Sequence, residues 1–69
     1  MKQQATKAIC QNIHDNQIMN VTIGFKSGTT KTYTCGDFDC ENDLEGIMIV
    51  QTEEGTDFID IDSIERITI

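Results

Sequence analysis

The chain is 69 residues long and carries twelve acidic and five basic side chains, so its formal net charge is -7. This length allows one small domain, residues 1–69, and the negative charge disfavours nucleic acid as a partner because it repels the phosphate backbone. No stretch approaches the roughly 20 apolar residues of a membrane-spanning helix, so we expect a soluble protein.

The cysteines indicate the cellular compartment, and the short chain length indicates whether the protein assembles. The three cysteines, Cys10, Cys35 and Cys40, cannot all pair within one chain, and no apolar leader core precedes them. We therefore expect a reducing, cytoplasmic environment. Domains of this size usually gain stability from a disulfide, a metal or a partner subunit, and we expect a homo-oligomer.

The N-terminal segment, residues 1–13, is expected to form a short amphipathic helix. Its apolar residues recur near helical spacing, and Gln, Lys and Ala, which favour helices, dominate its first half. The alternative is a strand over residues 8–13 that turns at His14-Asp15-Asn16, because Asx residues tolerate the backbone of a turn.

Two strands joined by a tight turn are expected next. Residues 18–25 alternate between apolar and polar side chains, which predicts a half-buried strand. Ser27-Gly28 supplies the turn, and residues 29–35 are rich in β-branched side chains, so the pair predicts a hairpin. Gly36 is expected to bend the second strand.

An acidic segment and a strongly apolar strand follow. Residues 37–45 carry five acidic side chains in nine positions, and we expect a long loop there. Residues 46–52 are apolar on both faces, which predicts a strand that is covered on both sides. Glu53-Glu54-Gly55 then forms a turn in which the glycine tolerates left-handed backbone.

The C-terminal part predicts two more strands. Residues 56–62 form the fourth strand, with their isoleucines pointing inward and Asp60 and Asp62 pointing outward. Asp62-Ser63 can cap a single helical turn, and residues 67–69 form a short last strand. The predicted fold is therefore mainly β, a small five-stranded bent barrel with a short N-terminal helix.

Three short stretches carry a resemblance to a known family. Residues 21–28, VTIGFKSG, match an alternating strand that ends in Asn-Gly, Phe38-Asp39 falls at the spacing of a Phe-Asp pair, and Asp62-Ser63-Ile64 sits where a short turn precedes the last strand. These stretches resemble the Sm-like family, in particular its bacterial Hfq branch. The resemblance implies a strongly bent barrel and assembly into a ring, although SH3-like barrels share the strand pattern.

Two departures from that family concern its RNA-binding function. Extra acidic residues follow Asp39, at positions 40–45. Ile61 and Asp62 stand where the RNA-binding family places a Lys-His pair, so an acid replaces a side chain that attracts phosphate. The resemblance therefore implies the fold without the RNA-binding function.

Two sets of side chains have the composition of metal ligands. The alternating acids of residues 37–45 offer oxygens to calcium, but Asn42 stands where an EF-hand loop needs Gly. Three thiols and one imidazole suit zinc, but the pair from the N-terminal segment would have to lie on one helical face beside the other two: Cys10, His14, Cys35 and Cys40. Buried cysteines commonly act as small apolar residues, and we expect neither a metal nor another cofactor.

No catalytic set is expected. His14 is the only histidine, and Asp15 follows it directly, but neighbours along a helix seldom face each other. No Gly-rich phosphate loop or Ser-His-Asp set can be assembled, and a domain of this size has little room for an enclosed pocket. We therefore expect a protein that is not an enzyme.

The remaining interpretation is an acidic module that acts by contact with a basic protein or with itself. By placing carboxylates where phosphates go, it could inhibit a nucleic-acid enzyme, as small acidic inhibitors from phage or mobile elements do. The alternative is an Sm-like oligomeric nucleic-acid-binding protein. The candidate partner-binding residues are all acidic: Asp37, Asp39, Glu41, Asp43, Glu45, Asp57, Asp60 and Asp62.

Overall fold

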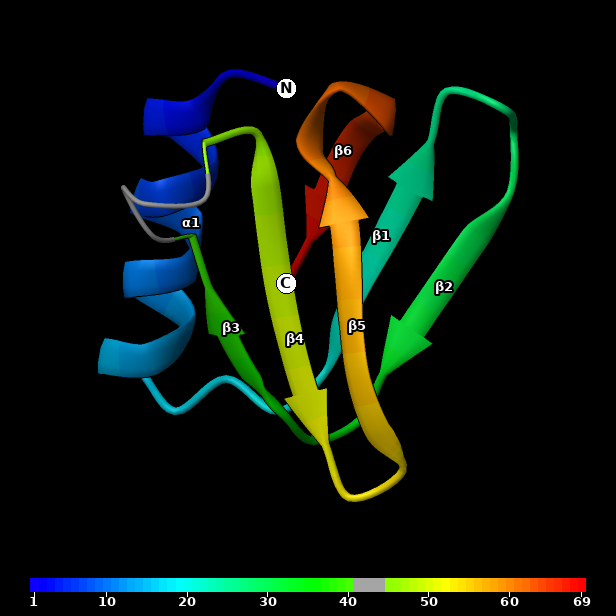
Figure 1. Ribbon diagram of the computed structural model, residues 1–69. Coiled ribbons are helices and arrows are strands. Elements are labelled where there is room, and N and C mark those ends of the chain that lie inside the picture. Colours follow the sequence, from blue (N-terminus) through cyan, green and yellow to red (C-terminus); the bar gives the residue numbers. More distant parts are fainter. Residues whose placement is uncertain (41–44) are drawn as a thin grey trace.

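The computed structural model describes residues 1–40 and 45–69 and contains one helix followed by two small antiparallel sheets. One sheet has the strand order β2-β1-β6 and the other the order β3-β4-β5. The two sheets lie one behind the other, with β4 and β5 in front of β1 and β6 (Figure 1). The elements are α1 (Gln3–Asp15), β1 (Val21–Phe25), β2 (Thr30–Tyr33), β3 (Asp37–Asp39), β4 (Ile47–Thr52), β5 (Gly55–Asp60), the 3-10 helix η1 (Ile61–Ser63) and β6 (Ile64–Thr68).

The predicted fold class is correct at its coarse level and wrong in its details. The chain is mainly β with a short N-terminal helix, but its described residues form six strands in two sheets and not a closed five-stranded barrel. The difference arises because the predicted second strand ends at Tyr33, and residues 34–36 carry the chain from one sheet to the other.

The predicted loop at residues 37–45 is also wrong at its start, where β3 pairs with β4. Glu41 and Asp43 lie outside the described residues.

Gly36 lies where the chain crosses between the sheets, beyond the end of the second strand that it was predicted to bend. A Cβ atom at this position would lie 3.0 Å from the Gln51 carbonyl oxygen and 3.1 Å from the Thr52 Cγ2 atom. The first of these neighbours belongs to the backbone of β4 and cannot move without disturbing the β3-β4 pairing. Glycine is therefore required by the close approach of two backbones.

We expect Gly36→Ala to lower the free energy of unfolding by about 1–3 kcal/mol, because the added methyl group overpacks this contact. Gly24→Ala is the matched control, since the atom nearest to its added Cβ is Cγ of the exposed and flexible Arg66 side chain, at 3.3 Å. Urea unfolding followed by circular dichroism measures both variants. Equal stability of the two variants would show that Gly36 does not pack against β4.

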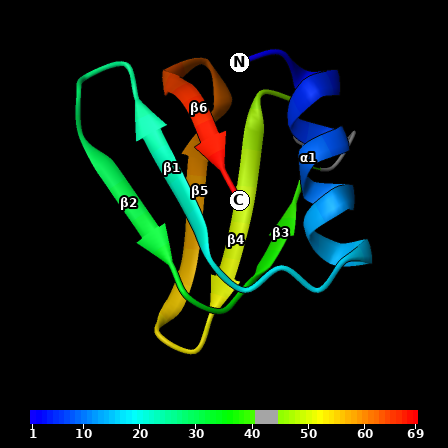
Figure 2. The same cartoon turned by 180° about the vertical axis from the view of Figure 1, so that it is seen from behind.

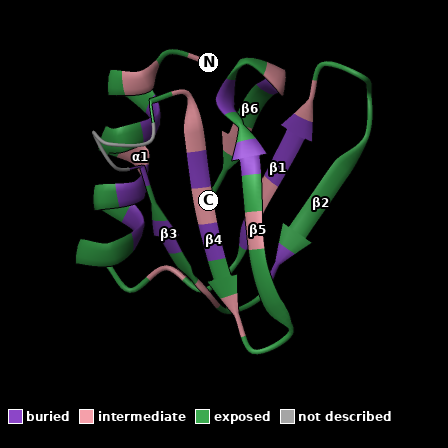
Figure 3. Ribbon diagram, in the orientation of Figure 1, coloured by how far each residue is buried: buried purple, intermediate pink, exposed green. Residues whose placement is uncertain are grey.

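The core lies between the facing sheets. Val21 and Ile23 of β1 and Met48 and Val50 of β4 have no exposed surface, and Ile64 of β6 is nearly as buried. Burial of these side chains supplies the main stabilising term of so small a domain. The alternation of buried and less buried residues along β1 and β4 is visible in Figure 3.

The N-terminal segment is helical, as predicted, and the strand alternative is wrong. The buried residues Thr6, Cys10 and Ile13 lie one turn apart on one face of α1. This face packs beside β3, as both views of the fold show (Figures 1 and 2). The helix ends at Asp15 with Asn16 as its C-cap, and Gln17 adopts left-handed backbone with a φ of 51°. Among the described residues, no helix is both long enough and apolar enough to cross a membrane.

The predicted hairpin and the inward-facing isoleucines are confirmed. β1 and β2 pair as an antiparallel hairpin, and Gly28 in the turn has a φ of 94°. Ile59 and Ile61 are buried, whereas Asp60 and Asp62 are exposed.

The turn before the last strand forms earlier than predicted. The fourth strand ends at Asp60 and not at residue 62, the turn is η1, and the last strand already begins at Ile64, so the predicted strand over residues 67–69 is too short. The cap of the turn also differs from the prediction. Asp60 Oδ1 accepts a hydrogen bond of 3.0 Å from the backbone N–H of Asp62, so Asp60 caps η1. The hydroxyl of Ser63 donates to the Asp60 carbonyl oxygen at 2.6 Å.

The prediction that residues 46–52 are covered on both sides is wrong. Met48 and Val50 face the core, whereas Ile47 and Ile49 are only half-buried on the opposite side of β4. An apolar run cannot by itself show whether a second layer covers the strand. In this fold the other sheet covers one face of β4, and the opposite face turns outward (Figure 1).

Candidate functional site

The outward face of the β3-β4-β5 sheet combines acidic and apolar side chains. Directly opposed residues of antiparallel strands point to the same side of a sheet. The pairing aligns Asp39 with Ile49 and Ile49 with Phe58 in one row, and Ile47 with Asp60 in the next. We call this surface the acidic face and define it by six residues: Asp37, Asp39, Ile47, Ile49, Phe58 and Asp60.

The register also explains why these acids are exposed. Phe38 of β3 and Ile59 of β5 point to the core, so their sequence neighbours point outward. Asp37 and Asp39 therefore lie at the β3 side of the face and Asp60 at the β5 side.

Charge is strongly segregated along the chain. Residues 37–65 contain eleven of the twelve acidic side chains and no Lys, Arg or His. The β3-β4-β5 sheet is built entirely from this segment, whereas Lys31 and Arg66 belong to the β2-β1-β6 sheet. The strands of the two sheets therefore differ in charge. Lys7 of α1 lines the same groove as Asp37 and Asp39, so the negative charge of the face is partly offset on its β3 side.

Phe58 is the most exposed large apolar side chain of the described residues, with 66% of its surface accessible. It lies on β5 beside Ile49, so the apolar surface at this point continues onto β4. Phe58 falls within the predicted fourth strand, residues 56–62, and no binding role was predicted for it. The signal that could have identified it was the alternation with Ile59, which places Phe58 on the same side as Asp60.

Asp57 has a different environment from the other acids of the sheet. Its carboxylate accepts hydrogen bonds from Lys31 Nζ at 2.7 Å and from the Tyr33 hydroxyl at 2.5 Å, both from β2. These contacts join the edge strands of the two sheets. The hydrogen bond from Lys31, followed by that from Tyr33, holds the pKa of Asp57 below its ordinary value of 3.8. Asp57 therefore links β5 to β2 at one edge of the fold and is not part of the acidic face.

We expect Asp57→Asn to lower stability at neutral pH and to have no effect in strong acid. A carboxyl group whose pKa is lowered by folding stabilises the protein above its unfolded pKa, and this contribution is lost as the pH falls through the lower folded value. The difference between wild type and variant should therefore shrink as the pH falls below 3.8. Thermal unfolding across pH measures it, and a difference that persists below this range would show that the charge is not responsible.

The cysteines and the histidine line one open groove of about 780 Å³ between α1 and β3. Cys10 and Cys40 are buried at this groove, whereas Cys35 is exposed. All four predicted zinc-ligand candidates therefore line this groove. Even so, no group of three or more His, Cys, Asp or Glu among residues 1–40 and 45–69 has the arrangement of a metal site.

The buried thiols are held in their neutral form. Burial, with smaller contributions from Cys40 and Asp39, raises the pKa of Cys10 to about 12. Burial also raises the pKa of Cys40. Because the thiolate is the reactive species, both side chains act here as small apolar residues of the core.

We expect a disulfide reagent such as Ellman's reagent to modify one thiol of the native protein rapidly, that of Cys35. Cys10 and Cys40 should react only as fast as the protein unfolds. The variant Cys35→Ser should lose the fast phase and keep the slow one. Three thiols that react at one rate in the native protein would contradict the burial of Cys10 and Cys40.

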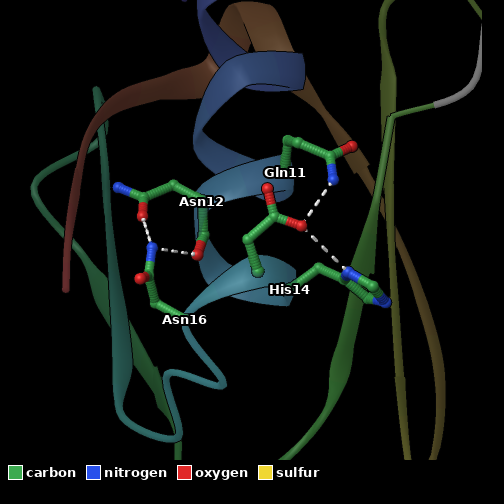
Figure 4. Close-up of polar contacts among 5 residues, drawn as sticks. Gln11, Asn12, His14 and Asn16 are labelled. Carbon is green, nitrogen blue, oxygen red and sulfur yellow. Dashed lines mark hydrogen bonds and ion pairs between the residues drawn. The ribbon is translucent and has the colours of Figure 1, made fainter.

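His14 lies at the exposed end of α1. Its Nδ1 is 3.4 Å from Asp15 Oδ1, so the expectation that these neighbours do not face each other is wrong (Figure 4). The same carboxylate oxygen accepts a hydrogen bond of 2.8 Å from Gln11 Nε2. Asn16 Nδ2 donates to the Asn12 carbonyl and side-chain oxygens on another side of the helix end. The His14 side chain is 79% exposed, so these contacts stabilise the end of the helix in water.

The predicted partner-binding residues thus divide into several groups. Asp37, Asp39 and Asp60 share the acidic face, and Asp57 is engaged between the sheets. Two others are exposed beyond the face: Glu45, which precedes β4, and Asp62, on η1. Comparison with protein-family models, with curated proteins and with solved structures found no match to this chain.

Proposed function

We propose that the protein is a non-catalytic interaction module that binds a basic protein through the acidic face. The observation that carries the proposal is the separation of charge between the two sheets, which leaves Asp37, Asp39 and Asp60 exposed without a basic residue on their strands. Such a surface attracts cationic partners over a long range and speeds their encounter. It also disfavours like-charged partners.

The partner that best fits this charge is the nucleic-acid-binding channel of a basic protein. Exposed carboxylates on a rigid sheet can occupy positions that backbone phosphates otherwise take, so the protein acts as an inhibitor by charge mimicry. An inhibitor of this kind, of the type that phage and mobile elements encode, needs no catalytic residues.

Fluorescence anisotropy with three labelled probes tests the proposal. An oligolysine peptide stands in for a basic partner, and single-stranded RNA and DNA oligonucleotides of matched length stand in for nucleic acid. We expect the peptide to bind in a salt-sensitive manner and the oligonucleotides not to bind. Submicromolar, salt-sensitive binding of either oligonucleotide would overturn the proposal.

One observation favours a second candidate, an Sm-like oligomeric nucleic-acid-binding protein. If β2 and β3 are counted as one strand that bends at Gly36, the order of elements is the one that the resemblance implies, including the short turn at Ile61–Ser63 before the last strand. In this reading, edge strands of neighbouring copies pair into a ring, and the ring supplies the site. Light scattering coupled to size-exclusion chromatography distinguishes the candidates when combined with the oligonucleotide titrations. A ring that binds RNA would favour the second candidate.

A further inference from the structure

We propose that the acidic face recognises a basic amphipathic helix, whose apolar stripe covers Phe58 and Ile49 and whose Lys or Arg side chains reach the acids on both sides. This inference rests on the proposed function and adds the chemical class of the partner segment. Charge alone would be satisfied by any cationic chain. The apolar residues at the centre of the face favour a partner that also presents apolar side chains.

The apolar part of the face is continuous. Phe58 pairs with Ile49 across β5 and β4, and Ile47 lies two residues along β4 from Ile49. Isolated exposed apolar residues are common, but exposed Phe58 adjoins two half-buried isoleucines, and together they offer a place where a partner can exclude water. Phe58 is the natural anchor because an aromatic ring buries a large area at a low cost in conformational entropy.

The spacing of the acids suits a helix. Asp39 lies on β3 and Asp60 on β5, the two outer strands of the sheet, with β4 between them. Two interstrand spacings separate these columns by about 10 Å. A helix with its side chains is about 10–12 Å across, so basic residues on its two flanks can reach the two columns while its apolar stripe lies over Ile49 and Phe58.

A second copy of the chain is a poorer occupant of this face. A two-fold contact would place one acidic face against another, so Asp37, Asp39 and Asp60 would meet like charges. The β2-β1-β6 sheet of a second copy offers few free positive charges to this face: Lys26 lies in the β1-β2 turn and Arg66 on β6, and Lys31 is paired with Asp57. The partner that complements the face is therefore a separate basic segment.

Two synthetic peptides of identical composition test the inference. One arranges Leu and Lys with helical periodicity, and the other scrambles the same residues so that no apolar stripe forms. We expect the amphipathic peptide to bind about tenfold more tightly, since burial of one aromatic side chain supplies at least that factor. Phe58→Thr should remove this advantage and leave the affinity for the scrambled peptide unchanged.

Phe58→Thr keeps a residue that favours strands, and circular dichroism checks that the variant is folded. Met19→Thr is the matched control, because Met19 is also largely exposed, at 60%, but lies outside the acidic face. Met19→Thr should retain the full difference in binding affinity between the two peptides. Equal binding of the two peptides to the wild-type protein would overturn the inference and leave the proposed function standing. Failure of both peptides to bind would overturn both.

Sedimentation of the protein alone provides the remaining check. A wild-type dimer that dissociates on Phe58→Thr, but not on Met19→Thr, would assign the face to a second copy and overturn the inference. If Phe58→Thr leaves the oligomeric state unchanged, the acidic face is free to bind a separate basic segment, as the inference requires.

Discussion

Val50→Asp is expected to unfold the protein, whereas Ile49→Asp, one position away on the same strand, should leave it folded. Val50 is fully buried between the sheets, and Ile49 is half-buried on the outward face. A domain core of this size supplies about 3–5 kcal/mol of net stability, and an uncompensated buried charge costs about as much. At position 49 water can solvate the carboxylate, so the cost is smaller.

Circular dichroism and urea unfolding at neutral pH measure this pair. Val50→Asp should show no cooperative transition, and Ile49→Asp should show one at a lower urea concentration than wild type. Val50→Asn is a useful companion variant. The asparagine amide is similar in size to the aspartate carboxylate but is uncharged, so it should be less damaging. Cooperative unfolding of Val50→Asp, or complete unfolding of Ile49→Asp, would show that β4 presents the opposite face to the core.

The second large effect concerns binding. The double variant Asp37→Lys/Asp39→Lys should bind oligolysine at least about tenfold more weakly than wild type, because attraction at the acidic face becomes repulsion. Both residues are exposed on β3 and neither caps a helix, so the fold should persist. Anisotropy titrations at low and high salt measure the loss, which should be largest at low salt.

A control variant with the same net charge distinguishes an effect of the acidic face from an effect of the total charge. Asp15→Lys/Glu65→Lys changes the net charge by the same amount, from -7 to -3, since each substitution adds two positive charges. Asp15 lies at the end of α1 and Glu65 on β6, both exposed and both outside the acidic face. This control should lose much less affinity. Equal losses would mean that binding follows the overall charge and has no preferred surface.

Local patterns in the sequence predicted much of the fold. The composition of the first residues predicted α1, the alternation of residues 18–25 predicted β1, and Ser27-Gly28 predicted the hairpin turn. Gly36 was predicted to bend the second strand, but that strand ends at Tyr33, before Gly36. The helix, the first strand and the hairpin turn depend on interactions between residues close together in the chain, which a sequence displays directly.

The features that were missed depend on contacts between distant residues. The split into two sheets follows from the pairing of β3 with β4, and the half-exposure of Ile49 follows from the absence of a covering layer on that side among the described residues. The engagement of Asp57 joins residues 24 and 26 positions apart. The charge segregation of residues 37–65 was present in the sequence, but only the strand pairing shows that it forms one face.

The most direct test of the acidic face is a titration of the isotopically labelled protein with the amphipathic Leu-Lys peptide, followed by backbone amide chemical shifts. The largest shifts should fall on β3, β4 and β5, centred on Ile49 and Phe58, and the β1-β2 hairpin should remain unchanged. Shifts confined to α1 or to the β2-β1-β6 sheet would contradict the assignment of this face as the binding surface.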